Sequence, residues 1–84
     1  EFNFKRSAKD ILINSQLRTA LILNKNIKAT NYQIDTYKKK NYIYGIAMTS
    51  EEKNLVISES EEILDVEKVI ASIILVEDLR IQKD

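Results

Sequence analysis

The most constraining feature of this sequence is the order of its apolar patterns along 84 residues. Segments with the helical spacing of apolar residues alternate with segments that have the strand-like spacing of two. Ser7 and Asp10 stand in the spacing of a capping box, which predicts a helix from Ser7, its N-cap, to about Asn24. Residues 31–37 and 42–48 alternate with a period of two, so we expect two strands joined as a β-hairpin. The apolar residues of the helix recur three and four apart on one stripe: Ile13, Leu17, Ala20 and Leu21.

The second half of the chain repeats the change of period. Thr49 and Glu52 have capping-box spacing and predict a second helix that reaches about Ile63. Residues 66–76 follow, and their β-branched stretch is apolar on both alternating faces, a pattern typical of a strand buried on two sides. After a hairpin and a crossover helix, this third strand must run parallel to one hairpin strand. The sequence therefore predicts an α+β fold, α-β-β-α-β, with two helices packed on one face of a mixed three-stranded sheet.

Length and composition limit the function as well as the fold. A chain of this size forms a single domain, residues 1–84, with a core of about residues 7–76 and a charged tail, 77–84, that we expect to fray. Absence of cysteine and histidine excludes disulfides, thiolate zinc sites and Ser-His-Asp triads. Glu61, Glu62 and Asp65 lack the spacing of a calcium loop. We expect no catalytic residue, metal site, cofactor or small-molecule substrate, and no apolar run is long enough to cross a membrane.

The hairpin has a glycine inside its second strand and none in its turn, and each feature leads to a prediction. Gly45 is the only glycine and falls inside the second strand, where we expect it to let a helix pack closely. The connection between the strands, Lys38-Lys39-Lys40-Asn41, has no glycine, whereas tight hairpin turns favour residues that adopt positive φ. A longer or bulged loop is therefore expected at the tip.

Charge is balanced over the whole chain but unevenly distributed. Residues 1–44 carry nine lysines and arginines against three acids, and residues 45–84 carry four against ten. Such asymmetry either creates a basic surface that attracts anionic lipid or nucleic acid, or is neutralised by pairing within the molecule. With one glycine there is no GXXG loop, and the chain is not strongly basic, so we expect no nucleic-acid partner. The candidate lipid-binding residues are Lys38, Lys39, Lys40, Tyr37, Tyr42, Arg18 and Lys25.

A second candidate surface follows from the layer count. Two helices can cover only one face of a sheet, yet the second strand is apolar on both faces and so is the third. An apolar face left open in this way either marks an interface or is tiled by tyrosines exposed to solvent. The candidate interface residues are Tyr44, Ile46 and Ile74 on the sheet, with Ile11 and Ile22 on the outer side of the first helix.

The order and spacing of these segments resemble the BON domain, the bacterial osmotic-shock and nodulation module, from about Ser7 to Leu75. The residues that carry the resemblance are Asp10, Ile13, Leu17, Ala20 and Leu21; Asn31, Tyr32, Ile34 and Thr36; the run Tyr42-Ile43-Tyr44-Gly45-Ile46-Ala47; Glu51 and Glu52; and Val66, Val69 and Ile73. Two positions depart from it, because the glycines common at the family's hairpin and before its last strand are replaced within Lys38–Lys40 and by Asp65.

The resemblance implies a non-catalytic module of the periplasm or outer membrane, whose parent chain is often a lipoprotein. It also implies binding to phospholipid surfaces or other envelope components. The expected partner is thus an anionic phospholipid surface, with a homo-oligomer or a second envelope domain as further partners. The alternative function is a protein-interaction or self-assembly module that uses the exposed apolar sheet face.

Overall fold

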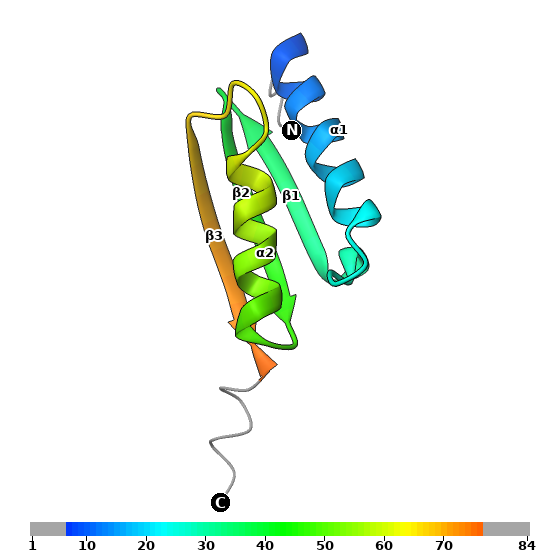
Figure 1. Ribbon diagram of the computed structural model, residues 1–84. Helices are drawn as coiled ribbons and strands as arrows, with labels where there is room; N and C mark the ends of the chain where they lie inside the picture. The colour runs from blue at the N-terminus through cyan, green and yellow to red at the C-terminus, as the bar shows by residue number, and fades with distance from the viewer. Residues whose placement is uncertain (1–6, 77–84) are drawn as a thin grey trace, which may run out of the picture.

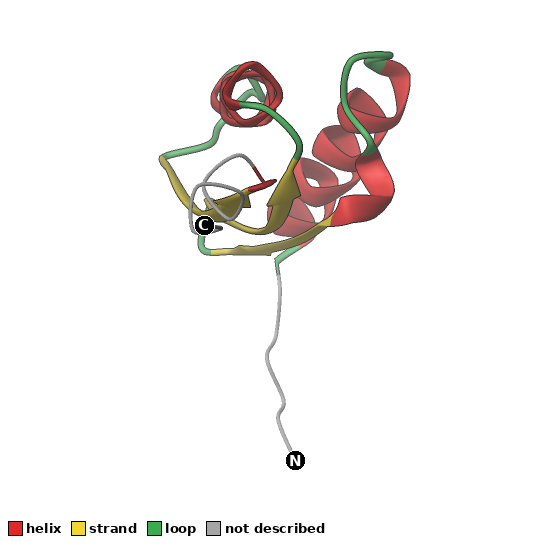
Figure 2. Ribbon diagram, turned by 90° about the horizontal axis from the view of Figure 1, so that it is seen from below, coloured by secondary structure: helices red, strands yellow, loops and turns green. Residues whose placement is uncertain are grey.

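The computed structural model describes residues 7–76 and confirms the α-β-β-α-β order (Figure 1). Strands β1 and β2 pair antiparallel and β2 and β3 pair parallel, in the order β1-β2-β3. Both helices lie on the same face of this mixed sheet (Figure 2), as the sequence predicts. The elements are α1 (Ala8–Leu23), a short 3-10 helix η1 (Ala29–Asn31), β1 (Tyr32–Tyr37), β2 (Lys40–Ala47), α2 (Ser50–Glu61) and β3 (Lys68–Leu75).

Both helices begin at the caps that the sequence indicates. The Ser7 hydroxyl accepts a hydrogen bond from the Asp10 N–H at 3.1 Å, and the Thr49 hydroxyl accepts one from the Glu52 N–H at 3.1 Å. In α1 the stripe residues Ile13, Leu17 and Leu21 are buried, while Ala20 is half-buried. None of the described helices is both long enough and apolar enough to span a membrane.

The strand register separates the two faces of the sheet. Ile43 lies opposite Ile34 and Ala71, and this row of residues points toward the helices. Tyr44 lies opposite Gln33 and Ser72 and points to the other face, which we call the open face. The buried hydrophobic cluster lies between the helices and the sheet: Leu17, Leu21, Ile27, Tyr32, Ile34, Ile43, Ala47 and Val56.

The prediction that the third strand is buried on two sides is wrong. β3 is an edge strand, none of its residues is fully buried, and Ile74 is 54% exposed. Only Val69, Ile73 and Leu75 pack against the core. An apolar run on both faces therefore reflects burial of one face by helices and an open apolar surface on the other.

Gly45 also has a different role from the expected one. A Cβ atom at this position would lie 2.5 Å from Cδ1 of Tyr32 and still closer to the carbonyl oxygen of Asn31. Tyr32 is the residue opposite Gly45 in the β1–β2 pair. The glycine thus allows the end of η1 and the start of β1, rather than α1 or α2, to approach the strand closely.

Candidate functional site

The three consecutive lysines lie on a tight two-residue turn rather than on the longer loop expected from the sequence. Lys38 and Lys39 connect β1 directly to β2, and their φ angles are 53° and 65°. Two successive positive φ angles characterise the turn that matches the twist of a hairpin, usually built from Asn-Gly. Lysine adopts this conformation at a cost, so something outside the turn must stabilise it.

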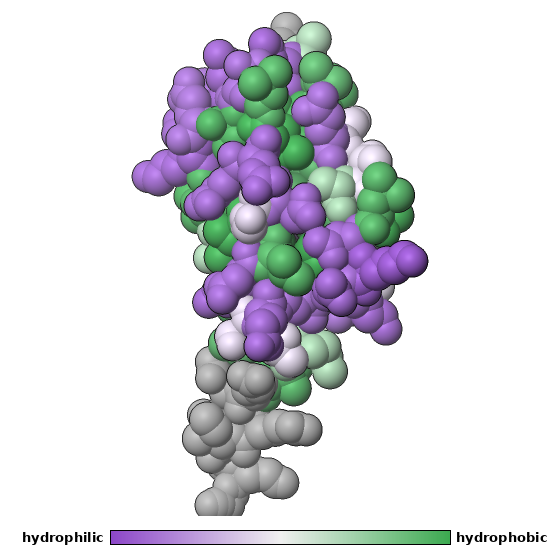
Figure 3. All heavy atoms as spheres, in the orientation of Figure 1, coloured by the Kyte–Doolittle hydropathy of each residue, from purple (hydrophilic) through white to green (hydrophobic). Residues whose placement is uncertain are grey.

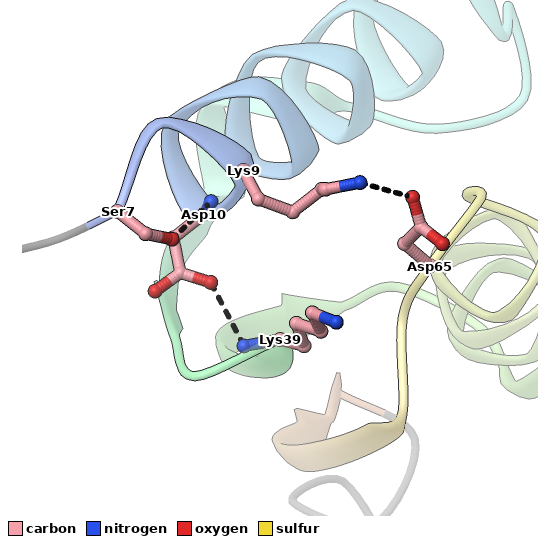
Figure 4. A network of polar contacts seen from close by, with 5 residues as sticks. All are labelled: Ser7, Lys9, Asp10, Lys39 and Asp65. Carbon is pink, nitrogen blue, oxygen red and sulfur yellow. Dashed lines mark hydrogen bonds and ion pairs between the residues drawn. The ribbon is translucent and has the colours of Figure 1, made fainter.

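Asp10 supplies that stabilisation. Asp10 is 3% exposed, and its two carboxylate oxygens accept hydrogen bonds from the N–H groups of Lys38 and Lys39, each at 2.8 Å. Figure 4 shows the bond from Lys39. Burial alone would raise the pKa of this carboxyl, but the hydrogen bonds from Lys39, Lys38 and Ser7 outweigh burial and lower the pKa below the ordinary aspartate value. Asp10 therefore stays charged and anchors the turn to the start of α1.

The loop before β3 closes the same end of the molecule. Lys9 and Asp65 form an ion pair at 2.9 Å between α1 and this loop (Figure 4), and the Glu67 N–H donates to the Lys39 carbonyl at 2.8 Å. The hydrogen bond and charge of Lys9 lower the pKa of Asp65. Both partners are largely exposed, so the pair orients the loop more than it stabilises the fold.

Basic and aromatic side chains gather around the turn, most of them on the open face of the sheet. The Lys38 ammonium lies 5.4 Å from the centre of the Tyr37 ring. Lys40 lies opposite Tyr37 on one side and opposite Lys68 on the other, and Tyr42 follows it on the same face. We call the set Tyr37, Lys38, Lys39, Lys40, Tyr42 and Lys68 the hairpin tip. Lys68 belongs to it through the β2–β3 register, which no local sequence pattern reveals.

Two candidate lipid-binding residues do not lie at the hairpin tip. Arg18 is in the middle of α1, where its Nε donates to the Asn14 side chain at 2.9 Å. Lys25 follows the end of α1, whereas Asp10 at the beginning of that helix contacts the turn. At 1.5 Å per residue, Lys25 is about 22 Å from the Asp10 end. Docking through the tip therefore cannot include Lys25.

Three of the five candidate interface residues lie together, as the sequence predicts. Tyr44, Ile46 and Ile74 are 48%, 44% and 54% exposed on the open face, and Ile46 lies opposite Ile74. Ile11 and Ile22 are also exposed, but they belong to α1 on the other side of the sheet. On that helical side, hydrophilic side chains occupy much of the surface over α2 (Figure 3).

Buried polar groups hold the framework beneath these surfaces. The Thr36 hydroxyl donates to the Asn41 side chain at 2.7 Å, and the Asn41 amide donates to the Ser60 hydroxyl at 2.9 Å, linking β1, β2 and α2 near the turn. At the other end, the Glu52 carboxylate accepts from the N–H groups of Lys28 and Met48.

Glu52 and Asp10 share one sequence signal. Each stands three residues after a helix N-cap, but each carboxylate reaches a distant loop instead of acting only as a local cap. Burial would raise the pKa of Glu52, yet the bonds from the two loop N–H groups lower it. Within residues 7–76 no group of three or more acidic side chains is arranged to hold a metal ion.

The tight turn leads to a stability prediction. Replacing Lys38 by Asn and Lys39 by Gly inserts the residues that adopt positive φ most readily, so the double variant should be about 1–2 kcal/mol more stable. Urea unfolding should show a higher midpoint with an unchanged slope. The control is Lys38→Gln with Lys39→Gln, which removes the same charge without relieving the backbone and should not gain this stability. An unchanged midpoint in the first variant would contradict the argument.

Comparison with known proteins finds a similar sequence in a curated protein. The chain is 34% identical over 71 residues to an uncharacterized protein in the gshII 5' region of Anaplasma centrale, a match that covers 84% of this chain and 47% of that protein. The chain thus spans about half the length of this curated relative. No protein-family model matches the sequence.

Proposed function

We propose that this chain is a non-catalytic BON-like module of the bacterial envelope that docks on anionic phospholipid surfaces through its hairpin tip. The observation that carries the proposal is the turn itself, in which a buried carboxylate fixes two lysines at the end of the molecule. Lys40 and Lys68 extend the charge onto the open face, and Tyr37 and Tyr42 stand beside them. A fixed backbone loses little conformational freedom on binding, which favours docking by such a small site.

The expected affinity of one tip is modest. Each basic residue near an anionic surface contributes about 1 kcal/mol, so four lysines supply about 4 kcal/mol, equivalent to a dissociation constant near 1 mM. The tyrosine rings can lie at the boundary between head groups and acyl chains and add to this. Stable attachment therefore needs a second signal, such as the lipoprotein anchor that the family resemblance implies for the full-length protein. On this proposal the module acts in the periplasm or at the outer membrane.

Vesicle co-sedimentation tests the proposal. The wild-type chain should bind vesicles that contain anionic phospholipid more strongly than neutral phosphatidylcholine vesicles, and the binding should weaken as salt rises. Replacement of Lys38, Lys39 and Lys40 by glutamine should lower the apparent affinity at least tenfold, because three of the four tip charges are lost.

A matched control separates a specific tip from a general effect of charge. Replacement of Lys25, Lys28 and Lys53 by glutamine removes the same charge from residues outside the hairpin tip. This variant should retain most of the binding. Equal losses in the two triple variants, or no binding of the wild-type chain at low salt, would contradict docking through the tip.

The second candidate function is a protein-interaction or self-assembly module that uses the open face. The favouring observation is the exposed apolar group Tyr44, Ile46 and Ile74 on a rigid sheet, with Met48 53% exposed next to it. Binding of this kind should depend little on salt. Tyr44→Ser with Ile46→Ser should abolish it and leave vesicle binding through the tip unchanged, which distinguishes the two functions.

A further inference from the structure

The outer edge of β3 has no hydrogen-bonded neighbour among residues 7–76, because the sheet order is β1-β2-β3. In a two-residue hairpin the flanking residues, Tyr37 and Lys40, bond to each other, so the next residue, Asn41, directs its backbone groups toward β3. Asn41 then bonds to the residues on either side of Val69, its register partner. The backbone N–H and carbonyl groups of Val69 itself therefore point away from β2. The same alternation leaves Ala71, Ile73 and Leu75 with outward-pointing N–H and carbonyl groups.

Edge strands normally carry features that prevent pairing with another chain. Charged side chains, prolines, bulges and short length are the usual ones. From Val69 to Leu75 the strand has no charge, no proline and no glycine, and Ser72 is its one polar residue. This composition is that of a strand with a partner.

We propose that the β3 edge pairs antiparallel with β3 of a second copy of this chain, to form a symmetric dimer with one continuous sheet. A two-fold axis at Ser72 pairs the whole run from Val69 to Leu75 with itself. Ser72 then lies opposite the partner copy's Ser72, Ile70 opposite Ile74 on the open face, and the small Ala71 opposite Ile73 on the helical face. Each residue meets one that points to the same face.

The placement of charge supports a second copy as the occupant, and the size of the contact sets its affinity. Lys68 lies one residue outside the paired run, so the lysines of the two copies are at opposite ends, about 27 Å apart along the strands. No like charges oppose each other within the run. A contact one strand wide is below the area of a standard stable interface, so the dimer should dissociate in the range of roughly 10 µM to 1 mM. This dimer is separate from both candidate functions. The hairpin tip proposed for lipid docking does not form the contact, and neither do Tyr44 and Ile46 of the open face.

Cysteine cross-linking tests the geometry, because the chain contains no cysteine of its own. In Ser72→Cys, the two substituted residues of the dimer lie directly opposite, with Cα atoms about 4.5 Å apart, within disulfide range. In Ile46→Cys, they are three strand spacings apart across the sheet, about 14 Å, and also four residues apart along the strands, about 13 Å, so they cannot form a disulfide. Mild oxidation should thus link the first variant and not the second. Linkage of Ile46→Cys but not of Ser72→Cys would instead show face-to-face association and overturn the edge pairing.

Sedimentation velocity supplies a second, independent measurement. The wild-type chain should change from monomer to dimer over about three decades of concentration around the expected dissociation constant. Ser72→Lys places two ammonium groups opposite each other and should weaken the dimer at least tenfold, whereas Ser72→Thr should retain it. Because the Ser72 side chain is exposed, both variants should unfold like the wild type in urea. A wild-type chain that stays monomeric at all concentrations, or a Ser72→Lys variant that dimerises equally well, would overturn the proposed dimer. Neither result would bear on vesicle binding through the hairpin tip, which is measured separately.

Discussion

Asp10→Ala is expected to lower the free energy of unfolding by about 3 kcal/mol, a large share of the stability of so small a domain. The Asp10 carboxylate accepts two hydrogen bonds from the turn, at 2.8 Å each, and a bond of this charge-assisted kind contributes about 1.5 kcal/mol or more. Urea unfolding at neutral pH measures the loss. Glu61→Ala, which removes an exposed acid from the end of α2, is the control and should change stability by less than about 0.5 kcal/mol.

The effect of Asp10 should depend on the residues of the turn. If the carboxylate acts by holding Lys38 and Lys39 at positive φ, it matters less where Asn-Gly forms the turn unaided. In the Lys38→Asn/Lys39→Gly variant, Asp10→Ala should cost at least about 1 kcal/mol less than in the wild type. An identical cost in both backgrounds would contradict this role and assign the loss to α1 capping alone.

Acid provides a further check on the same group. The pKa of Asp10 is lower in the folded chain than in the unfolded chain. Between these two pKa values the unfolded chain binds more protons, so stability rises with pH in that range. The contribution is complete above the ordinary aspartate pKa of about 3.9 and is lost as the pH falls through the folded value. The pKa of Glu52 is also lowered, so Glu52 likewise makes stability rise with pH. Both proteins contain Glu52, so its contribution cancels in their difference. The difference between wild type and Asp10→Ala should therefore shrink as the pH falls below the ordinary aspartate pKa of about 3.9.

The sequence was sufficient for the elements whose signals are local. Helix starts depend on hydroxyl caps one turn away, and strands show the period of two, so α1, α2 and the hairpin lie close to their expected places. The layer count also follows from the element order and predicts one open face, but only the burial and register of the strands show that Tyr44, Ile46 and Ile74 lie on it. Residue patterns within about ten positions of one another contain this information.

The contacts that the sequence did not reveal join residues far apart in the chain. Lys38 and Lys39 have no local preference for positive φ, and the carboxylate that makes it possible comes from a helix 28 residues earlier. Lys68 reaches the hairpin tip only through the parallel register with Lys40. The predicted burial of β3 on both sides is wrong for a related reason, since composition cannot distinguish an internal strand from an edge strand whose second face is also apolar.

Gly45→Ala should also destabilise the domain strongly, by about 2–3 kcal/mol. An alanine in a strand would ordinarily gain stability over glycine, by about 0.5–1 kcal/mol. Here the added methyl group would lie 3.0 Å from Cα of Tyr32 and nearer still to the Asn31 carbonyl oxygen, both backbone atoms that cannot turn aside. Relief requires the start of β1 to move away from β2, and overpacking of this kind costs about 1–3 kcal/mol or more.

The location of the damage distinguishes this clash from a general loss of packing. Hydrogen exchange should accelerate first at the Tyr32 end of β1, opposite Gly45, while the Asp10-bound turn at the other end of the hairpin stays protected. Ile46→Ala, next in sequence but exposed on the open face, serves as the control and should leave β1 exchange unchanged. A Gly45→Ala chain as stable as the wild type would mean that β1 can shift at little cost. The start of β1 would then be adjustable, and the glycine would no longer be required for its close approach to β2.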